Sequence, residues 1–140
     1  MPRLPRVTDS LLVRTDFSSE RLWALVCAEV KRTNDDGCQA YVATVSDRWF
    51  DGAPWQAVLA EVPAHDMGAA VLFIADSETL AQPQYPVLAV SLRKEHGAPF
   101  RCVAAELATV ESNLNVDKLG WADFASQVGA DGVFRGWLPD

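Results

Sequence analysis

The sequence has little of what marks membrane, secreted or cofactor-dependent proteins. No apolar run approaches the ~20 residues that span a bilayer. The basic N-terminal segment contains two prolines and no apolar stretch, so it does not resemble a secretion signal, and we expect a cytoplasmic protein. The eight glycines are scattered and form neither the G-x-G-x-x-G nor the Walker pattern. No cofactor is therefore predicted.

Cysteine and histidine are also scarce. The three cysteines, Cys27, Cys38 and Cys102, are odd in number, widely spaced and free of C-x-x-C, which indicates reduced thiols. The only histidines are His65, which an aspartate follows, and His96. A zinc site needs three or four ligands at characteristic spacing, so no metal site is predicted. No G-x-S-x-G motif marks a nucleophilic serine, although a Ser-His-Asp arrangement of distant residues stays open.

The charge balance is acidic, with 19 Asp and Glu against 12 Lys and Arg and a net charge of −7. Nucleic-acid-binding proteins cluster Lys and Arg on one face, so we predict no nucleic-acid partner. An acidic surface would attract a basic protein partner. The length of 140 residues fits one domain. We predict a single domain over residues 1–140, with an N-terminal arm at 1–9 because its prolines cannot join a sheet.

Two nearly pure apolar runs, 69–75 and 87–92, dominate the middle of the chain. Strands with this composition are usually buried on both faces under helices. We therefore place both strands side by side at the centre of a sheet. The polar connection between them is short for a parallel crossover, so the direction of the second strand stays open.

The remaining segments complete an α/β pattern. A strand at 11–16, a helix capped by Ser18 and a strand at 40–45 have the lengths of a right-handed parallel crossover. Further helices are predicted at 55–62, 77–80, 106–114 and 121–128, with Gly129 ending the last, and an antiparallel strand at 100–104. The tail, which carries Phe134 and Trp137, should dock on the core. The prediction is a single α/β domain with a central mixed sheet of about five strands flanked by helices.

Three stretches carry a family resemblance: residues 11–18, 73–76 and 132–136. Together, and in this order, they resemble a family of small, acidic, mostly actinobacterial single-domain proteins catalogued as a domain of unknown function. The resemblance covers essentially the whole chain. It implies a bacterial, cytoplasmic protein and brings no activity, cofactor or catalytic residue.

Asp16 and Asp76 are the candidate catalytic residues. Each follows an apolar strand and precedes a helical segment. In parallel strands both carboxylates would stand at the carboxyl edge of the sheet, where open α/β folds bind ligands. Two carboxylates there could hold Mg²⁺ or share acid–base chemistry. The alternative, which the frequency of such caps favours, is that each aspartate caps the helix that follows it.

The segment around Trp49 and Phe50 is the candidate binding site. Exposed aromatics rimmed by Asp47 and Asp51 would suit a protein interface. The alternative is a loop folded over the sheet, since large exposed apolar patches are rare on monomers.

Three functional classes follow from these features. The first is a non-enzymatic binding protein, such as an immunity-like inhibitor or a regulatory partner of another protein. The second is a small enzyme that uses Asp16 and Asp76. The third is a homo-oligomeric structural subunit joined through the Trp49–Phe50 loop or the tail. The oligomeric state stays open.

Overall fold

The two apolar runs form the central strands of a sheet. The computed structural model describes residues 4, 10–32, 40, 42–62, 71–92, 98–115 and 120–136. Strand β3 (Val71–Ala75) pairs with β4 (Pro86–Ser91), and every residue of β3 is buried. The pairing is antiparallel, with Phe73 opposite Ala89, which settles the direction that the sequence left open.

Among the described residues, six strands form one mixed sheet in the order β2-β1-β3-β4-β5-β6. Strands β1, β2 and β3 are parallel, whereas β4 runs antiparallel to β3 and β5, and β6 lies parallel to β5. The remaining strands are β1 (Ser10–Arg14), β2 (Val42–Val45), β5 (Phe100–Val103) and β6 (Val133–Phe134). The predicted single α/β domain with a mixed sheet is confirmed.

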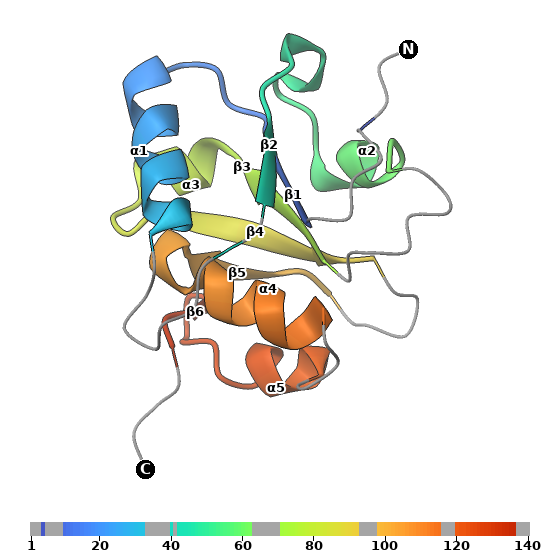
Figure 1. Ribbon diagram of the computed structural model, residues 1–140, viewed down its shortest axis with the longest axis vertical. Coiled ribbons are helices and arrows are strands. Elements are labelled where there is room, and N and C mark those ends of the chain that lie inside the picture. The colour runs from blue at the N-terminus through green and yellow to red at the C-terminus, as the bar shows by residue number, and fades with distance from the viewer. Residues whose placement is uncertain are drawn as a thin grey trace.

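Helices lie on both sides of this sheet. Helices α1 and α4 lie on one side and α2 on the other (Figure 1). The helices are α1 (Glu20–Lys31), α2 (Trp55–Leu59), α3 (Ser77–Ala81), α4 (Leu107–Asn115) and α5 (Trp121–Ala125), with 3₁₀ helices η1 (Arg48–Phe50) and η2 (Ala104–Glu106).

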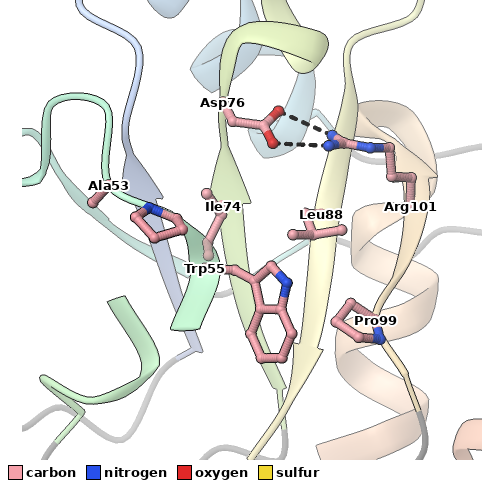
Figure 2. Close-up of a pocket in the computed structure, with 8 residues that line it drawn as sticks. Ala53, Trp55, Ile74, Asp76, Leu88, Pro99 and Arg101 are labelled. Atoms are coloured by element: carbon pink, nitrogen blue, oxygen red, sulfur yellow. Dashed lines mark hydrogen bonds and ion pairs between the residues drawn. The ribbon is translucent and has the colours of Figure 1, made fainter. Parts of the chain in front are cut away.

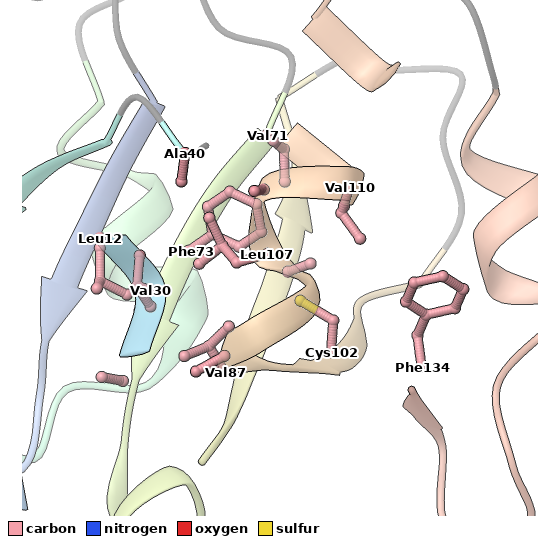
Figure 3. Packing of buried hydrophobic residues seen from close by; sticks show 14 of the residues in the cluster. Leu12, Val30, Ala40, Val71, Phe73, Val87, Cys102, Leu107, Val110 and Phe134 are labelled. Atoms are coloured by element: carbon pink, nitrogen blue, oxygen red, sulfur yellow. The ribbon is translucent and has the colours of Figure 1, made fainter. Parts of the chain in front are cut away.

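The larger core lies between the sheet and helices α1, α4 and α5. Phe73 and Val87 of the central strands are fully buried there against Val30 of α1 and Leu107 of α4 (Figure 3). Strands that are buried on both faces need other elements packed against each face. Helices α1, α4 and α5 supply this packing on one face.

The opposite face of the sheet has a smaller cover. Its core packs Val13 and Ile74 of the sheet against Phe50 of η1 and Val58 of α2. Leu4, the one described residue of the predicted N-terminal arm, is buried in the same cluster. Because α2 has only five residues, it covers one part of this face.

Several predicted helix boundaries are wrong. Helix α1 is capped by Ser19, whose hydroxyl accepts a hydrogen bond from the Leu22 N–H at 3.1 Å, and not by Ser18. Helix α2 ends at Leu59 instead of 62, and α5 ends at Ala125 instead of continuing to a stop at Gly129. Periodic apolar residues continue past both ends, which is why the pattern overestimated their length.

The tail prediction is confirmed for two residues. Val133 and Phe134 are buried and pair with β5 as a short strand, which the sequence analysis did not predict. Trp137 lies outside the described residues.

Candidate functional site

The carboxyl edge of the parallel strands is the first region to consider. The chain leaves β1 toward β2 through α1 on one face, and it returns from β2 to β3 through α2 on the other. The strand order therefore reverses between β1 and β3, and open α/β sheets bind ligands beside such a point. Asp16 follows β1 and Asp76 follows β3 at this edge.

Asp76 is held by two sets of bonds. Its Oδ1 accepts hydrogen bonds from the backbone N–H and the hydroxyl of Thr79, both at 3.1 Å, and so caps α3. Arg101 of β5 donates to both carboxylate oxygens, at 3.0 and 2.8 Å. Burial raises the pKa of Asp76, but the bonds and charge of Arg101, with the bonds from Thr79, outweigh it and lower the pKa. Arg101 and Thr79 therefore favour the ionised form of this carboxylate.

Arg101 also contacts groups other than Asp76. Its Nη1 also donates to the Pro86 carbonyl at 3.1 Å, and its Nε lies 2.7 Å from the Glu78 carboxylate. No pattern in the sequence indicated Arg101 as the partner of Asp76.

Asp16 contacts the segment that leads into α1. Its Oδ1 accepts a hydrogen bond from the Ser18 N–H at 2.8 Å, one residue before the cap of α1. Asp16 is thus not the N-cap of α1, which corrects the capping interpretation for this residue. The pKa of Asp16 is lowered by the hydrogen bonds of Ser18, with smaller contributions from Ser77 and the charge of Arg14.

A groove lies beside α2 on the face that α2 covers in part. It has a volume of about 410 Å³, a size found among small-ligand sites. Ile74 and Leu88 lie between Trp55 and the Asp76–Arg101 pair, which stands at one end (Figure 2). Asp76 lines this groove and Asp16 does not, so the two candidate catalytic carboxylates do not converge on it.

Arg14 is a feature of the edge that the sequence analysis missed. It ends β1, and its side chain is only 2% exposed. Its Nη2 donates to Glu20 at 2.8 Å, its Nη1 to the Ser46 hydroxyl at 3.2 Å and its Nε to the Asp16 carbonyl at 3.1 Å. Its guanidinium carbon lies 4.3 Å from the ring centroid of Phe17. The sequence feature that could have identified this residue is an arginine at the end of an apolar strand.

The predicted binding segment forms the 3₁₀ helix η1 at the same edge. Asp47 caps it by accepting a hydrogen bond from the Trp49 N–H at 2.9 Å. Phe50 is 1% exposed, whereas Trp49 is 44% exposed, and the two rings meet edge to face at 5.0 Å. Asp51 is exposed. Of the two predicted aromatics, only Trp49 is therefore available to a partner.

The turn that follows η1 is tied to β1. The Gly52 N–H donates to the Thr15 carbonyl at 2.8 Å, and the φ of +74° at Gly52 is one that other residues rarely adopt. Buried Phe50 and this bond fix η1 against the sheet.

The described part of the chain contains no group of three or more His, Cys, Asp or Glu side chains that could hold a metal ion. Four residues of the sequence analysis, His65, Asp66, His96 and Cys38, lie outside it. Within the same residues, no helix has the length and apolar character needed to cross a bilayer.

Fold and site together define a single-domain α/β protein with a mixed sheet and a polar carboxyl edge. Residues 9–137 match the family model described as Domain of unknown function (DUF6924), and the chain belongs to this family. The resemblance inferred from the sequence to a domain of unknown function is thereby confirmed. No curated protein matches the chain.

Proposed function

We propose that this protein is a non-enzymatic binding protein that docks a basic protein partner through η1, in the manner of an inhibitor or regulatory subunit. The observation that carries the proposal is the presentation of Trp49. Its side chain is 44% exposed on a turn that Phe50, the Asp47 cap and the bond of Gly52 hold in place. Tryptophan on a pre-organised surface is the residue type most enriched among binding hot spots.

The charge around Trp49 supports a basic partner. Asp47 and Asp51 lie two residues before and two residues after Trp49 in the chain and are both exposed, and the whole chain has a net charge of −7. Arg48 of the same turn has its guanidinium carbon 5.3 Å from the Phe17 ring centroid. An acidic rim would speed the encounter with a cationic partner, and salt would slow it.

The state of the candidate catalytic residues favours binding over catalysis. A general acid or base needs a free oxygen and a pKa near the working pH. Both oxygens of Asp76 are bonded to Arg101, and the pKa values of Asp76 and Asp16 are lowered. The bonds of Asp76 argue against a role in acid–base catalysis, and the lowered pKa of Asp16 argues against its use as a general acid.

The proposal can be tested without a known partner. A random peptide library is panned on the immobilised protein, and the selected peptides are titrated by fluorescence anisotropy at low and moderate salt. We expect peptides rich in Lys and Arg, with affinity that falls as salt rises. Trp49→Ala should weaken binding about tenfold or more, the loss typical of a hot spot.

Matched variants separate this site from others. Leu25, on α1, is the second exposed large hydrophobic residue among those described, at 39%, so Leu25→Ala should leave binding unchanged. Asp47→Asn keeps an oxygen for the Trp49 N–H but removes charge, and it should slow association. Peptides that bind Trp49→Ala as tightly as wild type would refute the assignment to η1.

A further inference from the structure

The Arg14 guanidinium is a buried cation with an exposed counter-ion. The Arg14 side chain is 2% exposed, but the Glu20 carboxylate that it contacts at 2.8 Å belongs to a side chain that is 75% exposed. A buried charge is costly unless it is paired, and an exposed carboxylate is a weak partner because water and salt compete for it. The fold therefore maintains a buried cation beneath an exposed carboxylate.

The guanidinium is held in a fixed orientation. Phe17 lies 4.3 Å from its central carbon and Trp23 5.4 Å, while the Ser46 hydroxyl and the Asp16 carbonyl accept from Nη1 and Nε. These contacts leave Nη2 directed at the Glu20 carboxylate. A planar guanidinium fixed in this way suits the recognition of a carboxylate or a phosphate.

A second cation, Arg48, lies near the same aromatic ring and acts on the same carboxylate. The Arg48 guanidinium carbon is 5.3 Å from the ring centroid of Phe17, the ring that also contacts Arg14. The pKa of Glu20 is lowered by its hydrogen bond with Arg14 and by the positive charges of Arg14 and Arg48. Negative charge at the position of the Glu20 carboxylate is thus favoured by both arginines.

The position in the fold agrees with a ligand site. Arg14 ends β1, Ser46 follows β2, and Arg48 begins η1, so all three residues stand at the carboxyl edge of the parallel strands. This is the edge at which the strand order reverses between β1 and β3, and ligands of open α/β sheets bind beside such a reversal.

We propose that Arg14, Arg48 and the Ser46 hydroxyl form an anion-binding site that Glu20 occupies in the free protein. The ligand is the carboxylate or phosphate group of a small molecule or partner, and it binds by displacing the Glu20 side chain. The site shares η1 with the proposed docking surface through Arg48, but Trp49 makes none of these contacts, so anion binding can be tested separately from the docking of a partner.

The test uses inorganic phosphate and acetate as probes. Each is titrated into the ¹⁵N-labelled full chain at constant ionic strength, with potassium chloride as the balancing salt, and arginine side-chain and backbone NMR shifts are followed. We expect saturable shifts at Arg14, Arg48 and Ser46. Saturation with phosphate alone would identify a phosphate site, and saturation with both anions a general oxyanion site.

Substitution of Glu20 tests directly whether its carboxylate competes with the probe anion. Glu20→Gln should bind the probe roughly two- to fivefold more tightly, because an exposed ion pair of ordinary strength no longer competes. Arg48→Ala should weaken binding. Glu29 pairs with Arg32 at 3.2 Å on the same helix, and Glu29→Gln is the matched control that should change nothing.

Two results would overturn the proposal. One is the absence of saturable shifts in Glu20→Gln with either anion, provided that its melting temperature shows a folded protein. The other is equal tightening in Glu20→Gln and Glu29→Gln, which would show that the lower net charge alone is responsible.

Discussion

Substitution of Asp76 by asparagine and by alanine should separate the two roles that this residue combines. Asparagine caps a helix about as well as aspartate, so Asp76→Asn removes the charge and the ion pair with Arg101 while it keeps the cap of α3. Asp76→Ala removes both. The difference between the two variants measures the cap.

The expected loss follows from partial burial. Breaking a fully buried pair costs about 3–5 kcal/mol and an exposed pair about 0–1 kcal/mol. The side chains of Arg101 and Asp76 are 16% and 29% exposed, and Arg101 keeps Glu78 as a partner, so we expect about 2 kcal/mol for Asp76→Asn. The lost cap adds about 1 kcal/mol in Asp76→Ala. In a domain of this size, these losses correspond to melting temperatures lower by about 6 and 9 °C.

The loss should also depend on pH. The pKa of Asp76 is lowered in the folded protein, so its stabilising contribution is complete above the unfolded pKa of about 3.9 and is lost as the pH falls through the lower folded value. Urea denaturation of wild type and Asp76→Asn should therefore show a constant gap from neutral pH to about pH 5. The gap should begin to narrow at about pH 4 and should close only as the pH falls through the lower folded pKa.

Asp123 provides a matched control. Its Oδ2 accepts a hydrogen bond from the Gly120 N–H at 2.7 Å at the start of α5, and the residue is exposed. Asp123→Ala should cost less than about 1 kcal/mol. If Asp76→Asn proves no more destabilising than Asp123→Ala, the ion pair with Arg101 does not stabilise the fold by the expected amount.

Two further predictions concern the core and the thiols. Phe73 of β3 is fully buried in the larger core, so Phe73→Ala should lower the free energy of unfolding by about 3–5 kcal/mol, measured by urea titration. An unfolding midpoint equal to that of the wild type would contradict its place in the core. Burial raises the pKa of both Cys102, which is fully buried, and Cys27, which is partly buried. Cys102 should therefore not react with Ellman's reagent in the native protein, and Cys27 should react slowly. Fewer than three reactive thiols in the denatured, unreduced chain would contradict the prediction that all three cysteines are reduced.

The centre of the fold could be predicted because its signal is local. The runs that contain Phe73 and Val87 have no polar face, so both faces of these strands were expected to be buried in the sheet. The direction of β4 was not predictable in this way, because the pattern of a doubly buried strand is the same in parallel and antiparallel pairing.

The candidate site was predictable only in part, because its polar contacts join distant segments. The position of Asp76 after a strand and before a helix identified the cap on α3. Its pairing with Arg101 depends on β4 and β5 folding back beside β3, which no spacing in the sequence specifies. The burial of Phe50 beside the exposed Trp49 likewise depends on the orientation of a single turn.

The mixed topology has a consequence for the order of folding. Strands β3, β4 and β5 follow one another along the chain and pair as neighbours, whereas the pairing of β1 with β3 brings Leu12 beside Phe73 across a long intervening segment. Closing a long loop costs more entropy than closing a short one, and contacts between distant residues slow folding. The antiparallel half should therefore assemble first and serve as the template to which β1 and β2 are added, so that the edge carrying Arg14 and Trp49 is completed last.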